Sequence, residues 1–123
     1  MAFKVAIVGG EGTEDYAFYE QKCIKMLREK GKEGCGIMIY TNGDEFNDKF
    51  AEKFSIDIRY FYTDWKQYGN DALRERNKEM LADADAVIVF EDGLKDTKFF
   101  SEMAKEKGIP YRYFKKKVVD VAE

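Results

Sequence analysis

The stretch Ala84-Asp85-Ala86-Val87-Ile88-Val89-Phe90-Glu91-Asp92-Gly93 does most to decide the fold of this chain. Residues 86–90 are continuously apolar, as expected for a strand that is buried on both faces. Strands of this kind are typical of parallel sheets covered by helices on either side. The acidic residues and the glycine that follow place a polar loop at the carboxyl end of the strand, where open α/β sheets bind their ligands.

Apolar strand patterns and helical patterns alternate along the rest of the chain. Further strands are predicted at residues 4–8, 37–40, 56–61 and 109–114. Helices are predicted at residues 16–30, 71–82 and 97–107, together with a short helix capped by Asp44 or Asn47. This alternation predicts an α/β fold, a Rossmann-like three-layer sandwich with a five-stranded parallel sheet and helices on both faces. Residues 1–117 are expected to form a single domain, and residues 118–123 a tail or an edge extension.

The composition argues against several classes of protein. The 123 residues include no histidine, which removes imidazole bases and most zinc chemistry. Cys23 and Cys35 are too few for a disulfide framework and are expected to be free thiols in a reducing cytoplasm. A net charge of −3 argues against general nucleic-acid binding. No apolar run approaches the roughly 20 residues of a membrane span, so we expect a cytoplasmic domain without a metal site or a membrane contact.

Two polar loops follow the first two predicted strands. Gly9-Gly10-Glu11-Gly12-Thr13 lets the backbone approach a ligand, although a plain tight turn explains the glycines equally well. Thr41-Asn42-Gly43-Asp44-Glu45-Phe46-Asn47-Asp48 offers short polar side chains and carboxylates. These carboxylates would repel phosphate, but they suit ribose hydroxyls or a hard cation. Helix capping by Asp44 or Asn47 is the structural alternative.

Trp65 and Arg76 are the other candidates for ligand contact. Trp65 follows the third predicted strand and is either a lid on the core or a surface on which a base stacks. Arg76 lies on a helix that also carries Arg74 and Lys78, so it is either a solvated charge or an anion contact.

Nearly the whole chain, roughly residues 4–114, resembles the YspA-like branch of the SLOG superfamily, whose relatives include the LOG phosphoribohydrolases and the DprA core, and the match is closer in the middle. The family pattern Ala-Asp-Trp, Tyr-Gly, Arg-Asn-x-x-Met corresponds to residues 63–65, 68–69 and 76–80 here. Its Ala-Asp, apolar strand and terminal Gly-Ile-Pro correspond to residues 84–90 and 108–110. The glycine-rich loops of the family are only weakly matched, with Gly43 and Asp48 as the residues in common after the second strand.

The resemblance implies the strand order 3-2-1-4-5 and a nucleotide-derived ligand in a cleft between the first and fourth strands. The residues predicted to line this site, from the loops and from the family pattern together, are Gly9, Gly10, Glu11, Thr41, Asn42, Gly43, Asp48, Trp65, Arg76, Asn77, Asp92, Gly93 and Thr97. The resemblance also implies a homodimer. Aromatic residues at positions 46, 50 and 54, and the adjacent Phe99 and Phe100, offer apolar contacts for it.

The catalytic loop of the LOG enzymes is not preserved. Their glutamate corresponds to Phe100, which neither accepts a proton nor stabilises positive charge. We therefore predict a sensor-type domain that binds a nucleotide or a nucleotide-derived ligand, with no catalytic residue assigned. One alternative is an N-glycosidic or phosphate hydrolase that uses Glu11, Asp48 or Asp92. The other alternative is a protein-interaction domain whose pocket has decayed.

Overall fold

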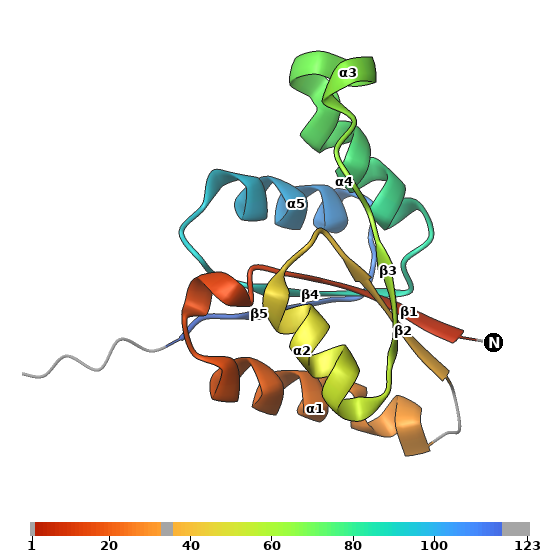
Figure 1. Cartoon of the computed structure of the whole chain (residues 1–123), viewed down its shortest axis with the longest axis vertical. Helices are drawn as coiled ribbons and strands as arrows, with labels where there is room; N and C mark the ends of the chain where they lie inside the picture. The colour runs from red at the N-terminus through yellow and green to blue at the C-terminus, as the bar shows by residue number, and fades with distance from the viewer. Residues whose placement is uncertain (1, 33–35, 117–123) are drawn as a thin grey trace, which may run out of the picture.

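The computed structural model describes residues 2–32 and 36–116, and it confirms the predicted α/β fold. Five parallel strands form one sheet in the order β3-β2-β1-β4-β5 (Figure 1). The strands are β1 (Ala2–Val8), β2 (Gly36–Thr41), β3 (Asp57–Tyr60), β4 (Ala86–Phe90) and β5 (Tyr111–Phe114). The helices are α1 (Tyr16–Lys32), α2 (Glu45–Phe54), α3 (Trp65–Tyr68), α4 (Ala72–Ala82) and α5 (Lys95–Glu106), with short 3-10 turns η1 (Glu11–Thr13) and η2 (Gly69–Asp71).

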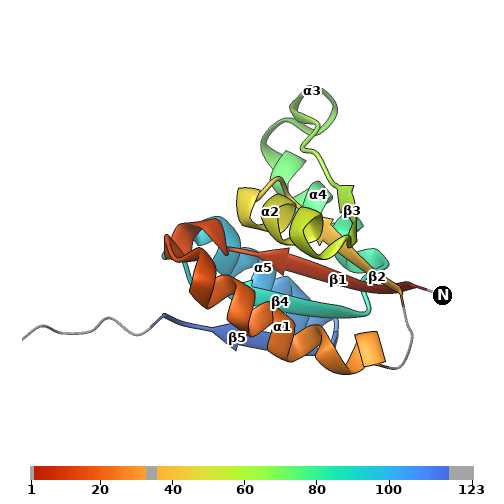
Figure 2. The ribbon, with the colours of Figure 1, turned by 60° about the horizontal axis from the view of Figure 1, so that its bottom comes forward.

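Helices cover both faces of the sheet, with α1 and α2 on one face and α4 and α5 on the other (Figures 1 and 2). Successive residues of a strand point to opposite faces, so each central strand supplies side chains to both cores. The first core joins the sheet to α1 and α2 through Val5, Ile7, Ile39, Ile88, Phe90, Tyr19, Cys23, Leu27, Phe50 and Ala51. The second joins it to α4 and α5 through Ala6, Val8, Tyr40, Val87, Val89, Phe61, Met80, Leu81, Phe100 and Ala104.

Several predicted boundaries differ from the structure by one or two residues. Helix α5 begins at Lys95 rather than at residue 97, because the loop after β4 closes on itself: Thr97 Oγ1 donates to Asp92 Oδ2 across 2.7 Å. Strand β5 begins at Tyr111 rather than at residue 109, although the Pro110 carbonyl already accepts from the backbone of Val87. The predicted tail or edge strand at residues 118–123 and the predicted thiol of Cys35 lie outside the described residues.

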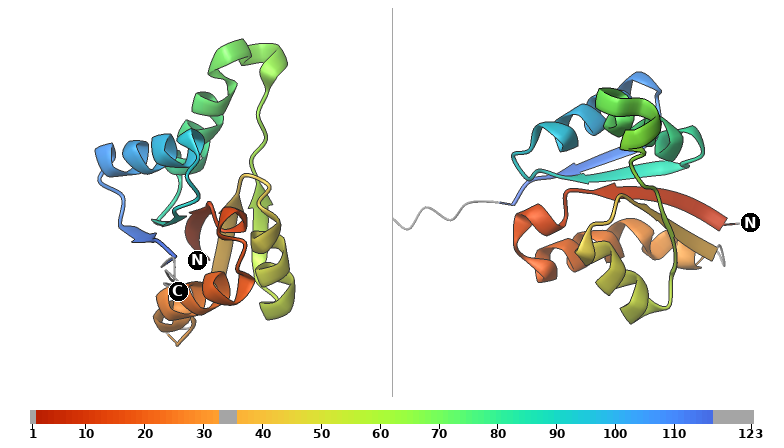
Figure 3. Two further views of the ribbon diagram at one scale, coloured as in Figure 1. Left: turned by 90° about the vertical axis from the view of Figure 1, so that its left-hand side faces the viewer. Right: turned by 45° about the horizontal axis from the view of Figure 1, so that its top comes forward.

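Residues 62–71 project from the rest of the domain and are called the arm here (Figures 1 and 3). The arm carries α3 and η2, neither of which the sequence predicted as a separate element. None of its residues is buried, whereas Phe61 before it and Ala72 after it are buried. The arm is therefore held at its two ends and presents nearly all of its side chains to solvent or to a ligand.

Candidate functional site

A hollow of about 520 Å³ opens at the carboxyl edge of the sheet, where the loops after β1, β2 and β4 meet α4. We call it the loop hollow. This volume lies within the range of about 300–1,000 Å³ that is usual for small-ligand sites. Its lining includes many of the predicted site residues: Gly9, Glu11, Asn42, Gly43, Arg76, Asp92 and Thr97, joined by Gly12, Asp44, Leu73, Leu94 and Asp96.

Arg76 is the cation of the loop hollow. Its Nη2 and Nε donate to Asn77 Oδ1 across 3.1 and 3.4 Å, so its hydrogen-bonded partner is a neutral amide. No salt bridge to Arg76 occurs within residues 2–32 and 36–116. Burial lowers the pKa of the guanidinium, and the charge of Asp96 opposes this shift. The site thus contains a partly desolvated positive charge.

Asp48 and Asp92, two carboxylates that could have formed a structural ion pair with Arg76, are engaged elsewhere. Asp48 accepts from the hydroxyl of Tyr60. Asp92 accepts from Thr97 Oγ1 and, across 2.9 Å, from the backbone N–H of Leu94. An ion pair between Arg76 and either residue is therefore not present.

The glycines after β1 are explained by packing within the protein. A Cβ atom on Gly9 would lie 2.0 Å from the Phe90 carbonyl oxygen, and Gly9 also has a φ of +83°. A Cβ on Gly10 would lie 2.5 Å from the Tyr19 ring, and one on Gly12 would lie 2.3 Å from Asp92 Cβ. These three glycines let the first loop pack against β4, α1 and the loop after β4. Close packing thus accounts for these glycines without a ligand, and ligand contact at Gly9 and Gly10 stays a prediction.

The first turn of α2 is already occupied by carboxylates of the protein. Asp44 Oδ1 accepts from the backbone of Phe46, and its Oδ2 accepts from the backbone of Glu11, both across 2.9 Å. Glu11 Oε2 in turn accepts from the backbone of Glu45 across 3.3 Å. Burial raises the pKa of Asp44, and the backbone N–H donors oppose that shift. Because free N–H groups at a helix start are what would attract phosphate, this position is unsuited to a second anion.

The predicted cap residue Asn47 has a different role, since Asp44 caps α2. Asn47 is fully buried, and its Nδ2 donates to the Ile7 carbonyl across 2.9 Å and to Thr41 Oγ1 across 2.8 Å. Its Oδ1 accepts from the Tyr19 hydroxyl across 2.5 Å. This network ties β1, β2, α1 and α2 together directly below the loops. It also accounts for Thr41, which is fully buried within it rather than open to the hollow.

The remaining predicted residues lie outside the loop hollow. Gly10 and Asn77 are buried, and Asp48 lies on α2 beside Tyr60. Gly93 is exposed and donates its N–H to Glu91 across 2.7 Å. Trp65 lies on the arm and lines a different hollow.

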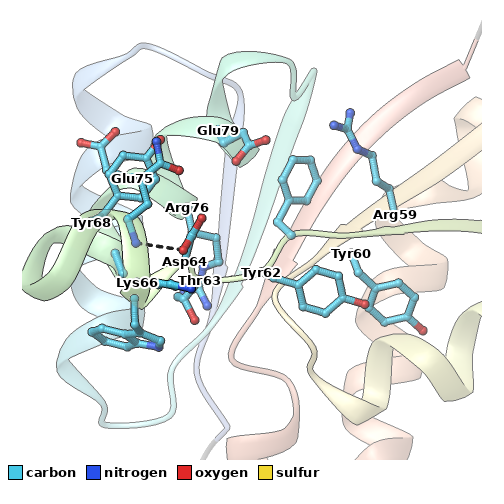
Figure 4. A pocket seen from close by; sticks show the side chains of 14 residues that line it. Arg59, Tyr60, Tyr62, Thr63, Asp64, Lys66, Tyr68, Glu75, Arg76 and Glu79 are labelled. Carbon is cyan, nitrogen blue, oxygen red and sulfur yellow. Dashed lines mark hydrogen bonds between the residues drawn. The ribbon is translucent and has the colours of Figure 1, made fainter.

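A second hollow of about 760 Å³ lies between the arm, α4 and the end of β3; we call it the arm hollow (Figure 4). Figure 4 shows Tyr60 and Tyr62 on one side of it and Lys66, Tyr68 and Glu75 on the other. Arg76 lines this hollow as well as the loop hollow. The full lining is Arg59, Tyr60, Phe61, Tyr62, Thr63, Asp64, Trp65, Lys66, Gln67, Tyr68, Ala72, Glu75, Arg76 and Glu79.

The arm hollow was not foreseen in the sequence. Tyr60 at the end of β3 and Tyr62 after it occur at alternate positions, as in an ordinary edge strand, and nothing in their spacing indicates a separate surface. Asp96 and Leu94 were also missed, because the predicted helix began after them.

Phe100 is buried in the second core, so this position of α5 faces the sheet rather than either hollow. Phe99, its neighbour, is 42% exposed. Within the described ranges, no group of three or more acidic or cysteine side chains is arranged to hold a metal ion. In the same part of the chain, no helix has both the length and the apolar character needed to cross a membrane.

No protein-family model matches the chain, and no curated protein sequence matches it. The resemblance to the SLOG superfamily therefore stays a prediction. The structure defines the chain as an α/β domain in which the loop hollow and the arm hollow adjoin at the carboxyl edge of the sheet and share Arg76.

Proposed function

We propose that this domain binds a small nucleotide-like anion at the carboxyl edge of its sheet and acts as a sensor-type module rather than as an efficient enzyme. The observation that supports it is the environment of Arg76, which is partly desolvated, oriented by the neutral amide of Asn77 and placed at the boundary of two hollows. A forked guanidinium can bind a phosphate through two charge-assisted hydrogen bonds.

The carboxylates of the loop hollow favour binding over catalysis. Asp44 and Asp92 each accept two hydrogen bonds from the protein, and Glu11 accepts one at the start of α2. A general base must be free to take a proton from the reacting group. These contacts hold Glu11, Asp44 and Asp92 in structural roles. Asp96, the fourth carboxylate of the hollow, acts on the guanidinium of Arg76 through its charge, and we assign no catalytic residue.

The experiment is a titration of the purified protein with a panel of nucleoside monophosphates, followed by calorimetry and by melting temperature. Arg76→Ala is expected to weaken binding by roughly 2–4 kcal/mol, and Arg76→Lys to recover part of this loss because the ammonium has no forked geometry. Arg74→Ala is the matched control, since Arg74 lies on the same helix, pairs with Asp71 and lines neither hollow.

Three results would contradict this proposal. If Arg76→Ala lowered the melting temperature by several degrees and left nucleotide affinity intact, the arginine would be structural. If chromatography detected free base after incubation with a nucleotide, the hydrolase alternative would be correct. A panel in which no nucleotide changes the melting temperature would favour an interaction domain with a decayed pocket.

We also propose that the domain forms a homodimer, as the family resemblance implies. Most of the aromatic face of α2 is used within the first core, where Phe50 is buried and Phe46 packs against Tyr16 and Tyr19. Among the aromatic residues predicted for the dimer, Phe54 and Phe99 remain about two-fifths exposed and are available to a partner. Light scattering at tens of micromolar should give twice the monomer mass of 14.3 kDa, and the monomer mass would refute the dimer.

A further inference from the structure

The two hollows have different chemistry and share one residue, Arg76, on α4. On this helix, Ala72, Glu75 and Glu79 face the arm hollow, whereas Leu73 faces the loop hollow. Arg76 therefore lies on the boundary between them. A ligand that reaches into both hollows must pass the guanidinium.

The loop hollow is suited to hydroxyl groups rather than to phosphate. Four carboxylates line it, those of Glu11, Asp44, Asp92 and Asp96, against the single guanidinium of Arg76. An anion deep in this hollow would meet like charges. A hydroxyl group, by contrast, can donate a hydrogen bond to a carboxylate, and it can donate to or accept from the exposed amide of Asn42. An anionic group is therefore most favourable at the boundary of the hollow, beside Arg76.

The arm hollow is suited to a planar group. Four of its aromatic side chains are substantially exposed: Tyr60 at 40%, Tyr62 at 78%, Trp65 at 54% and Tyr68 at 42%. Aromatic surfaces of this kind stack on the planar faces of bases. Lys66 and Arg59 add positive charge to the same hollow, and Asp64, Glu75 and Glu79 add negative charge.

We propose that the two hollows hold the two ends of one ligand, a nucleoside diphosphate sugar: the base lies on the aromatic side chains of the arm, the diphosphate lies at Arg76, and the hydroxyl-rich sugar occupies the loop hollow. This inference rests on the proposed function and makes it more specific. A nucleoside monophosphate carries its anion at one end, so with its phosphate at Arg76 it fills a single hollow. A molecule with its anion in the middle fills both.

The test compares ADP-, UDP- and GDP-glucose with AMP, UMP and GMP by calorimetry on the full chain. For the base that the protein recognises, the diphosphate sugar is expected to bind at least about tenfold more tightly than the nucleoside monophosphate with the same base. Asn42→Ala should reduce this advantage by weakening binding of the diphosphate sugar more than binding of the monophosphate, because Asn42 lines the loop hollow and not the arm hollow.

Trp65→Ala should weaken binding of both compounds by roughly tenfold, through the lost stacking surface. Phe99→Ala is the matched control, since Phe99 is an exposed aromatic residue that lines neither hollow. Trp65 is the single tryptophan of the chain, so its emission should also change when the diphosphate sugar binds.

The outcomes separate this inference from the proposed function. Monophosphate binding that depends on Arg76, with no tighter binding of the diphosphate sugar and no effect of Trp65→Ala, would overturn the two-hollow ligand and leave the proposed function intact. Absence of binding by every compound in both series would overturn both.

Discussion

Asn77 orients the guanidinium of Arg76 without neutralising it. The two donor nitrogens of Arg76 reach the same Asn77 oxygen across 3.1 and 3.4 Å, and Asn77 itself is buried. A carboxylate at this position would supply the same acceptor geometry together with a negative charge. The amide therefore leaves the positive charge available to an anion of a ligand.

Asn77→Asp tests this relationship directly. The substitution keeps the shape of the side chain and adds a carboxylate beside Arg76, so it should weaken nucleotide binding by roughly tenfold or more through competition for the guanidinium. The Arg76 side chain should keep its position, but its guanidinium should be less available to the anion of the ligand. Titration of the variant with the nucleotide that binds the parent protein measures the effect. Unchanged affinity would mean that the anion of the ligand does not lie at Arg76.

Gly9 is expected to be required for folding rather than for binding. Gly9→Ala would place a Cβ atom against the Phe90 carbonyl at a φ of +83°, and we expect a loss of roughly 2–4 kcal/mol in the free energy of unfolding. Gly36→Ala is the matched control, because nothing lies within 4 Å of its added Cβ. Urea unfolding of both variants measures the difference. Equal stability of the two would refute the packing explanation of the glycine loop.

The fold could be predicted because the information is local. Residues 86–90 are apolar throughout, and the strand that they form, β4, has the predicted bounds and is buried along most of its length. The alternation of strands and helices then leaves few topologies, because crossovers between parallel strands are right-handed. The order 3-2-1-4-5 rested on the family resemblance, and the structure has the same order.

The site could be predicted only in part, because the roles of its residues depend on distant partners. Asn47 looks like a helix cap in the sequence, but its amide spans residues 7, 19 and 41, which no local pattern connects. Trp65 was expected at the cleft with Arg76. In the structure Trp65 lies on the arm and lines the arm hollow together with Arg76, whereas the predicted loop residues line the loop hollow.

Asp83 lies at the edge of the sheet opposite the hollows, and it should make the free energy of unfolding depend on pH. The Tyr40 hydroxyl and Lys4 Nζ donate to its carboxylate across 2.7 and 2.9 Å, and they lower the pKa of Asp83. A lowered folded-state pKa gives stability that is present above the unfolded value, about 3.9, and lost as pH falls through the folded value.

Asp83→Asn is therefore expected to be less stable than the parent protein at neutral pH, and the difference should shrink as pH falls below about 4. Urea unfolding at a series of pH values measures it. Nucleotide binding at neutral pH should not change, since Asp83 lines neither hollow. A stability difference that stays constant with pH would show that the charge of Asp83 is not involved.

Asn47 is expected to be the most sensitive polar residue of the domain. Asn47→Ala would leave the Ile7 carbonyl, Thr41 Oγ1 and the Tyr19 hydroxyl in the core without this amide, and buried groups that lose their partners are costly. We expect a loss of roughly 2–4 kcal/mol in the free energy of unfolding, against less than about 0.5 kcal/mol for Asn42→Ala, which changes an exposed asparagine in the neighbouring loop.

Tyr19→Phe should cost about 1–2 kcal/mol, and the double variant Tyr19→Phe with Asn47→Ala should cost less than the sum of the two, because both changes remove the same hydrogen bond. Urea unfolding of the parent protein, the two single variants and the double variant gives the double-mutant cycle. Strict additivity of the two losses would mean that the hydrogen bond between Tyr19 and Asn47 contributes nothing to stability.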